Sequence, residues 1–137
     1  MCKDLWPEIV ASTDDSPKSI LMQQAEYIGK KTEGRILGYV ETTDGKYYET
    51  KKDMNNLIKR SENDLCHKLY IRVPDMNNVR FLIASVLQNP FQIFPCHIYD
   101  EVNEKEFNNI SNNDKVIEIL KSILQSEKMV TLLSSLL

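Results

Sequence analysis

The stretch LCHKLYIRVPDMNNVRFLIASVLQNPFQIFPCHIY, residues 65–99, decides the fold of this chain. It contains three runs rich in β-branched, aromatic and leucine residues, at residues 65–73, 79–87 and 91–99, and such runs favour strands. The connections between them are far too short for the crossover that parallel strands need. The sequence therefore predicts a three-stranded antiparallel meander.

The three runs also differ in how their apolar residues are arranged. In residues 65–73, apolar side chains such as Leu69 and Ile71 alternate with polar ones such as Lys68 and Arg72, which indicates one buried and one wetter face. The run VRFLIASVL, residues 79–87, is apolar at almost every position. We therefore expect it to be the central strand, with a helix packed on at least one side.

A helix is predicted before the meander, in SPKSILMQQAEYIGKKTEG, residues 16–34. Ser16 is a good N-cap, Pro17 suits the first helical position, and Gly34 suits the position just past the end. Residues at three- and four-residue steps form one mostly apolar stripe, namely Ile20, Leu21, Gln24, Ala25 and Ile28.

Between this helix and the meander, the sequence predicts a β-hairpin. Residues 35–43 are rich in strand formers, and the pair Asp44-Gly45 that follows is a strong signal for a type I′ turn into a second strand at residues 46–50. Residues 51–63 have few apolar anchors and are predicted to form a short helix or an ordered surface loop.

The rest of the chain is predicted to be helical. An acidic lead-in at residues 100–106 precedes helices at residues 113–125 and 127–137, with Ser126 as the N-cap of the last one. The order of helix, strands and helices predicts an α+β fold, in which a mainly antiparallel sheet, made of the N-terminal hairpin and the meander, is packed by an N-terminal helix and C-terminal helices.

Composition and length favour one globular domain over residues 1–137. The chain is 42% hydrophobic and 27% charged, with a net charge of −3, which is ordinary for a folded protein. Its three scattered cysteines suit reduced thiols. We find neither a secretion signal nor a span of the roughly 20 apolar residues needed to cross a bilayer, so we expect a cytoplasmic location and no membrane contact.

Two Cys-His dipeptides, Cys66-His67 and Cys96-His97, are the most tempting chemical feature. Adjacent residues on a strand point to opposite faces, so the dipeptides do not suit a four-ligand zinc site. A cysteine nucleophile would need an activating histidine on a neighbouring strand, and no motif for an oxyanion hole is present. The sequence predicts no cofactor, no metal and no catalytic residue, although an enzyme with an unrecognised Cys/His site stays an alternative.

Residues 30–60 form a basic window of eight cations and five anions. Tyrosines lie among the cations, as in surfaces that stack bases and pair phosphates. From this window Tyr47, Lys51 and Lys52 are candidate partner-binding residues, and a nucleic-acid-associated accessory protein is an alternative function. The interleaved acids and the negative net charge weigh against it.

The aromatic string at residues 89–99 supplies the other candidate partner-binding residues, Phe91, Phe94 and Tyr99. Its prolines confine a strand to an edge or a bulge, where aromatic side chains can meet a partner. The competing interpretation is that the same rings lie in the core beneath the C-terminal helices.

The C-terminal run MVTLLSSLL, residues 129–137, must dock on the sheet or be shared with a second copy, so the chain is a monomer or a homodimer. Together these features predict a non-enzymatic cytosolic protein-interaction module, of the adaptor, inhibitor or immunity type, whose partner is another protein.

Overall fold

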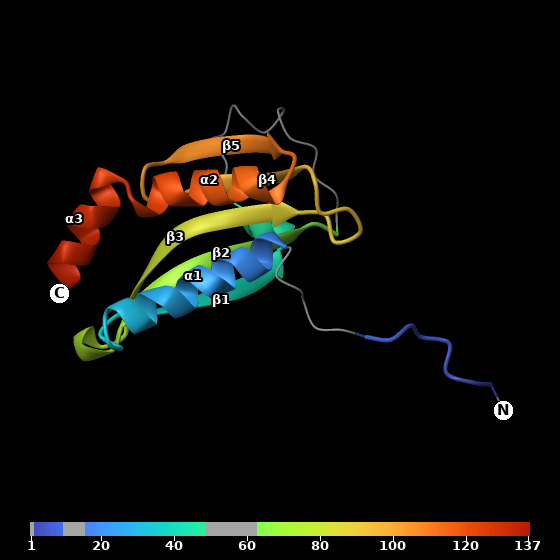
Figure 1. Cartoon of the computed structure of the whole chain (residues 1–137), viewed down its shortest axis with the longest axis horizontal. Coiled ribbons are helices and arrows are strands. Elements are labelled where there is room, and N and C mark those ends of the chain that lie inside the picture. Colours follow the sequence, from blue (N-terminus) through green and yellow to red (C-terminus); the bar gives the residue numbers. More distant parts are fainter. Residues whose placement is uncertain (1, 10–15, 49–62) are drawn as a thin grey trace.

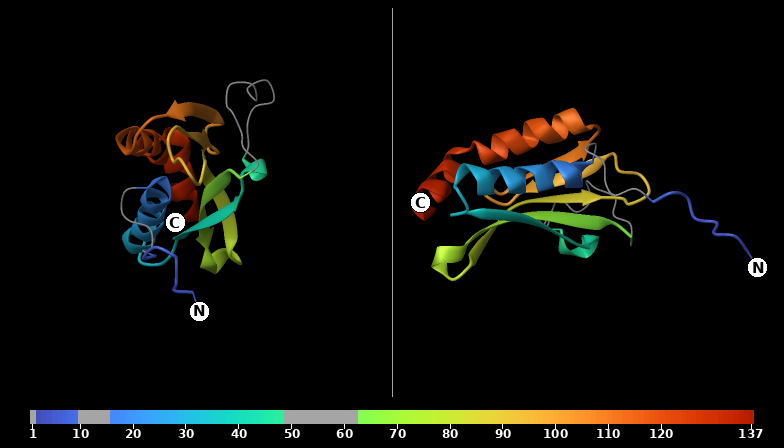
Figure 2. Two further views of the ribbon diagram at one scale, coloured as in Figure 1. Left: turned by 90° about the vertical axis from the view of Figure 1, so that its right-hand side faces the viewer. Right: turned by 60° about the horizontal axis from the view of Figure 1, so that its bottom comes forward.

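The computed structural model describes residues 2–9, 16–48 and 63–137. Its elements are α1 (Pro17–Lys31), β1 (Leu37–Asp44), β2 (Leu65–Val73), β3 (Val79–Gln88), β4 (Cys96–Asp100), β5 (Lys105–Ile110), α2 (Asn113–Leu124) and α3 (Glu127–Leu136). The strands form one antiparallel sheet in the order β1-β2-β3-β4-β5, and the three helices lie on one side of it (Figures 1 and 2). The predicted α+β fold class is confirmed, with β3 at the centre.

Helix α1 begins and ends where its sequence signals predict. The hydroxyl of Ser16 accepts a hydrogen bond from the backbone N–H of Ser19 at 3.1 Å, which satisfies one of the first-turn donors. Beyond the last turn, Gly34 has a φ of 82°, a left-handed conformation that glycine adopts without penalty.

Helix α1 packs very closely on β1, and Gly38 makes this possible. A Cβ atom at Gly38 would lie 2.6 Å from the Cα atom of Ala25 in α1, much closer than carbon atoms can approach. A small residue on each side therefore sets the distance between the helix and the edge strand.

The sheet has two different faces. On the face under the helices, which we call the helical face, β2 and β3 contribute Leu69, Ile71, Ala84 and Val86 to the main core. A register shift next to Leu69 leaves Ile83 without a partner in the ladder, and its side chain joins the same core. The bulge therefore adds one residue of β3 to this face, and Leu82 and Leu87 on the other face complete the nearly continuous apolar run of β3.

The opposite face, which we call the open face, carries the alternate residues of each strand, and no helix in the described part of the chain covers it (Figure 2). At one end of it a second, small cluster of buried residues lies beside the segment that follows β1. It consists of Tyr48, Cys66, Leu87 and Tyr99.

The predicted tight hairpin at Asp44-Gly45 is wrong. Asp44 pairs with Leu65 in β2, and Gly45–Tyr47 forms a 3₁₀ helix that the side chain of Asp44 caps. Gly45 is needed for another reason, because a Cβ there would lie 2.8 Å from the backbone oxygen of Asp64. An Asp-Gly pair serves an Asx cap as well as a type I′ turn, and the sequence alone does not separate the two. The predicted strand at residues 46–50 ends in residues outside the described range, as does most of the predicted surface element at 51–63.

Two boundaries in the second half of the chain also differ from prediction. The strand expected at residues 91–99 begins only at Cys96, after an irregular segment. The lead-in expected before the C-terminal helices contains the edge strand β5 instead. Asn109, at a φ of 58°, forms a bulge in β5 beside Ile110, so Phe107 and Ile110 both reach the core at a three-residue spacing. That spacing hides the alternation by which strands are recognised.

Helix α3 docks on its own chain. Ser126 caps it as expected, accepting a hydrogen bond from the backbone N–H of Met129, and Met129 is buried. Leucines of α3 pack against the main core, and the guanidinium of Arg35 donates to the backbone oxygen of Leu137 at 2.7 Å. The helix therefore closes one end of the helical layer (Figure 1).

Candidate functional site

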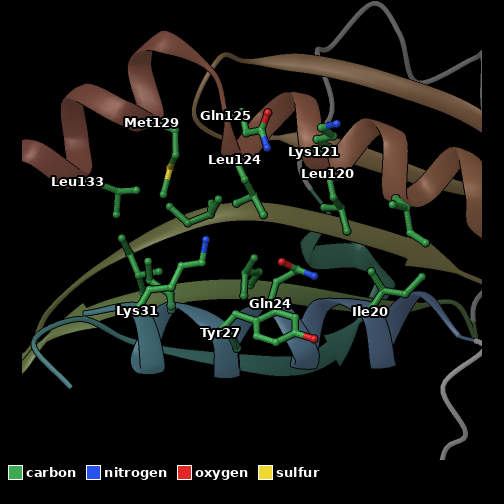
Figure 3. Close-up of a pocket in the computed structure, with 16 residues that line it drawn as sticks. Ile20, Gln24, Tyr27, Lys31, Leu120, Lys121, Leu124, Gln125, Met129 and Leu133 are labelled. Atoms are coloured by element: carbon green, nitrogen blue, oxygen red, sulfur yellow. The ribbon is translucent and has the colours of Figure 1, made fainter. Parts of the chain in front are cut away.

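A cleft on the helical face separates α1 from α2 and α3 (Figure 3). Its volume is about 380 Å³, which lies in the range of ligand-binding pockets. Leu69, Ile71 and Ile83 of the sheet form its floor. The cleft exists because α1 packs closely on β1 at Gly38, whereas α2 lies over the opposite edge of the sheet, near β5 (Figure 1). The two helices therefore do not close over the middle of the sheet.

The walls of the cleft come from the apolar stripes of the helices. On one side α1 contributes Ile20 and Ile28, and on the other α2 and α3 contribute Leu120, Leu124 and Met129. Figure 3 shows the labelled side chains of the two walls pointing toward one another. They belong to the apolar stripes that these amphipathic helices turn toward the sheet. The interior of the cleft is therefore almost entirely apolar.

The rim of the cleft is polar and partly exposed. It includes Gln24, Tyr27 and Lys31 of α1 on one side and Lys121 of α2 with the neighbouring Gln125 on the other (Figure 3). Among the described residues that line the cleft, the two lysines are the only charged ones. An apolar interior with two cations at its mouth suits a ligand that has an apolar body and nearby carboxylates.

Two further lining residues extend the apolar surface outward. The side chains of Tyr27 and Ile117 are 50% and 51% exposed, although each belongs to a helix whose other face is buried. Neighbouring apolar groups that stay in contact with water around a cleft are typical of interaction sites. The surface therefore continues beyond the cavity along both helices.

Of the side chains that commonly take part in catalysis, the described lining of the cleft includes only lysine and tyrosine. Its described lining residues include no carboxylate, histidine, cysteine, serine or threonine, so no nucleophile has an adjacent base and no acid and base are paired. The side chains that are present are suited to binding a ligand and orienting it. This composition favours a binding site over a site of covalent chemistry.

The structure separates the two Cys-His dipeptides by face. Cys66 and His97 belong to the open face, whereas His67 and Cys96 belong to the helical face. At most two of the four side chains therefore share a face. Within residues 2–9, 16–48 and 63–137, no group of three or more potential metal ligands is found.

The chemistry of Cys96 is that of a buried thiol. Burial raises its pKa to about 12, against a small opposing effect of a backbone hydrogen bond. Its thiolate, the form that attacks substrates, is therefore disfavoured at neutral pH.

His67 is buried at the end of the helical face that lies near the start of α1. Its Nδ1 atom and the hydroxyl of Thr42 are 2.8 Å apart. The pKa of His67 is lowered to about 4, mainly by burial and also by the positive charge of Lys18, while a hydrogen bond with the side chain of Gln88 opposes the shift. The imidazole is thus neutral at pH 7 and acts as a polar group inside the core.

The candidate partner-binding residues do not lie together. Phe91 is 87% exposed on the irregular segment before β4, Phe94 packs against the main core, and Tyr99 is only 6% exposed. Tyr47 ends the 3₁₀ helix after β1, and Lys51 and Lys52 lie outside the described residues. A role for these residues in partner binding stays a prediction, and of the three aromatic residues near β4 only Phe91 offers most of its side chain to solvent.

On the open face, the described part of the basic window contributes to an aromatic and cationic stack. The rings of Tyr39 and Tyr70 stack with centroids 5.2 Å apart. The guanidinium of Arg80 lies 4.5 Å from the centroid of Tyr70, donates to the hydroxyl of Tyr39 and pairs with Glu41 at 3.7 Å. The polar and charged groups of the stack are therefore largely paired with one another.

Sequence reasoning missed the cleft, although one signal was present. Gln24 interrupts the apolar stripe of α1, and it now lies at the rim. The opposing residues Lys121 and Gln125 occupy the edge of the stripe of α2, where polar side chains are ordinary. Only the packing of two distant helices brings these residues to one mouth.

Comparisons with known proteins identify no family for this chain. No protein-family model, no curated protein and no solved structure matches this chain. The described helices are all too short or too polar to span a membrane.

Proposed function

We propose that this protein is a non-enzymatic, cytosolic protein-interaction module, of the adaptor, inhibitor or immunity type, that holds an apolar segment of another protein in the cleft between α1 and α2. The observation that carries the proposal is the cleft itself, an apolar cavity beside which the half-exposed side chains of Tyr27 and Ile117 extend the apolar surface. A partner helix or extended segment that inserts apolar side chains between two helices would use both.

The charges at the rim indicate the kind of segment. Lys31 and Lys121 come from opposite walls and have no carboxylate beside them among the described lining residues. Complementary charge at a rim steers association and excludes partners of like charge. We therefore expect the bound segment to carry carboxylates next to its apolar side chains.

Site-specific photocrosslinking tests the proposal. A benzophenone amino acid placed at Tyr27 or at Ile117 should form adducts with another protein in the native cell, identified by mass spectrometry. The same amino acid at Val79, which is exposed at the start of β3 and does not line the cleft, serves as the control.

The charge-reversed variant Lys31→Glu with Lys121→Glu should reduce the adducts from Tyr27 without affecting the thermal transition, because surface charges contribute little to stability. Adducts that are equally abundant from Val79, or that do not respond to charge reversal, would contradict the proposal.

A second candidate function is nucleic-acid binding on the open face, and the observation that favours it is the Arg80 guanidinium beside two tyrosines. Bases stack on aromatic rings whose faces are accessible. Here Tyr39 and Arg80 both lie against the ring of Tyr70, and Arg80 also donates to the hydroxyl of Tyr39, which leaves less ring surface for a base and weighs against this alternative. A mobility shift with single-stranded RNA that is lost in Arg80→Gln would favour this alternative.

A third candidate, an enzyme with an unrecognised Cys/His site, draws no support from the environment of the thiols. The raised pKa of Cys96 opposes formation of a nucleophile. Retained crosslinking activity in Cys66→Ser and Cys96→Ser variants that still fold would be consistent with a binding function.

A further inference from the structure

The N-terminal segment, residues 2–9, exposes three large apolar side chains. Leu5, Trp6 and Ile9 are 83%, 79% and 84% exposed, and Figure 1 shows the segment leading away from the body of the molecule. It has some local order, since the carboxylate of Asp4 accepts a hydrogen bond from the backbone N–H of Trp6 at 3.0 Å. A tryptophan, a leucine and an isoleucine exposed together are typical of a segment that binds another surface.

This segment and the cleft are complementary in chemistry. The segment combines apolar side chains with the carboxylates of Asp4 and Glu8, which outnumber its one cation, Lys3, whereas the cleft combines an apolar interior with Lys31 and Lys121 at its rim. The carboxylates of the segment therefore complement the lysines of the rim, and its apolar side chains match the apolar interior of the cleft. Tryptophan is also the side chain most often found to dominate binding energy when it enters an apolar pocket.

The two also match in length. Leu5 and Ile9 are four residues apart, which is about 13 Å in an extended chain. Along α1 the cleft runs from Ile20 to Lys31, which is about 17 Å of helix. The apolar part of the segment therefore fits within the cleft.

We infer that residues 5–9 of one copy of this chain bind in the cleft of a second copy. The inference rests on one part of the proposed function, the binding of an apolar segment in this cleft, and takes the segment from a second copy of the chain. A second copy is the occupant that agrees with the structure, since the chain's own segment is exposed and extends away from its cleft. If the exchange is reciprocal, two cleft contacts form about a two-fold axis and both sets of exposed side chains are covered.

The fluorescence of Trp6 tests this directly, because it is the only tryptophan in the chain. As the full-length protein is concentrated, we expect a blue shift of emission and a loss of acrylamide quenching. Both changes should follow the formation of dimers observed by sedimentation velocity, and dilution should reverse them.

Variants separate the contact from general effects on folding. Trp6→Ala should weaken each cleft contact by about thirtyfold, the usual cost of truncating a dominant tryptophan. Asp4→Lys with Glu8→Lys, and separately Lys31→Glu with Lys121→Glu, should each weaken it. A chain that combines all four substitutions should dimerise again, since the charges are exchanged but still opposite. Val79→Ala, which removes exposed apolar atoms outside the cleft, should leave the dimer unchanged.

Two results would overturn the inference. In the first, Trp6 stays accessible to quencher and the protein stays monomeric at every concentration. In the second, Trp6 is protected at every concentration in a monomer, which would place the segment in the cleft of its own chain. Neither result touches the proposed function, because crosslinking from Tyr27 to a different protein is a separate measurement. Conversely, adducts from Tyr27 that contain only a second copy of this chain would support the inference and contradict a heterologous partner.

Discussion

The two faces of the sheet use their residues in different ways. The helical face is built from aliphatic side chains that are almost completely buried between strands and helices, such as Ile83, Val86 and Ile98. Apart from the small buried cluster around Cys66 and Leu87 at one end, the open face is built from more exposed side chains, of which the stack of Tyr39, Tyr70 and Arg80 is the clearest group. The difference indicates that most of the stability comes from one face through burial, while the other face contributes specific, smaller pair interactions.

The largest expected effect compares the same substitution on both faces. Leu21→Ala, at a fully buried position of α1, should lower the free energy of unfolding by about 2–5 kcal/mol, because it removes buried methyl groups and leaves a cavity. Leu82→Ala, on the open face opposite Tyr70, should cost only about 1 kcal/mol, since this leucine is partly exposed. Urea denaturation at pH 7 measures both, and equal losses would remove the distinction between the faces.

The next effect depends on pH and concerns His67 on the helical face. Its pKa falls from 6.5 to about 4 in the folded protein, so protons bind preferentially to the unfolded chain between these values. Stability is therefore present above pH 6.5 and is lost as the pH falls toward 4, by about 2 kcal/mol between pH 7 and pH 5. Urea denaturation at the two pH values measures this loss.

The control for this prediction is His67→Gln, which keeps a polar side chain but does not titrate. It should show a much smaller change between pH 7 and pH 5. A wild-type protein that is equally stable at both values would contradict the burial of a neutral imidazole.

The smallest expected effect concerns the stack on the open face. A double-mutant cycle with Tyr39→Ala and Tyr70→Ala should give a coupling energy of about 0.5–1.5 kcal/mol, the usual value for an aromatic pair. As the matched control, Tyr27 lies on the other side of the sheet, so Tyr27→Ala and Tyr70→Ala should be additive. If the losses of stability from Tyr39→Ala and Tyr70→Ala were additive, the two rings would not stabilise each other.

Prediction from sequence succeeded where local chemistry was sufficient and failed at two kinds of position. The caps at Ser16 and Ser126 were predicted correctly, because capping depends on residues within one turn. The hairpin at Asp44-Gly45 was not, because the same pair can cap a 3₁₀ helix. The strand β5 was missed because the bulge at Asn109 breaks its alternation, and a bulge depends on the neighbouring strand as much as on its own residues.

The sequence by itself determined the α+β class, the antiparallel order of β2, β3 and β4, and the beginnings of the helices. These follow from short connections, side-chain periodicity and caps, all of which act over a few residues. The tertiary structure decided which face is covered and where a cleft forms. Lys31 and Lys121 are 90 residues apart in the chain, and they share one rim only because Gly38 lets α1 lie directly on β1 while α2 packs across the sheet. Such a distance depends on how closely two elements pack, and no pattern within either helix encodes it.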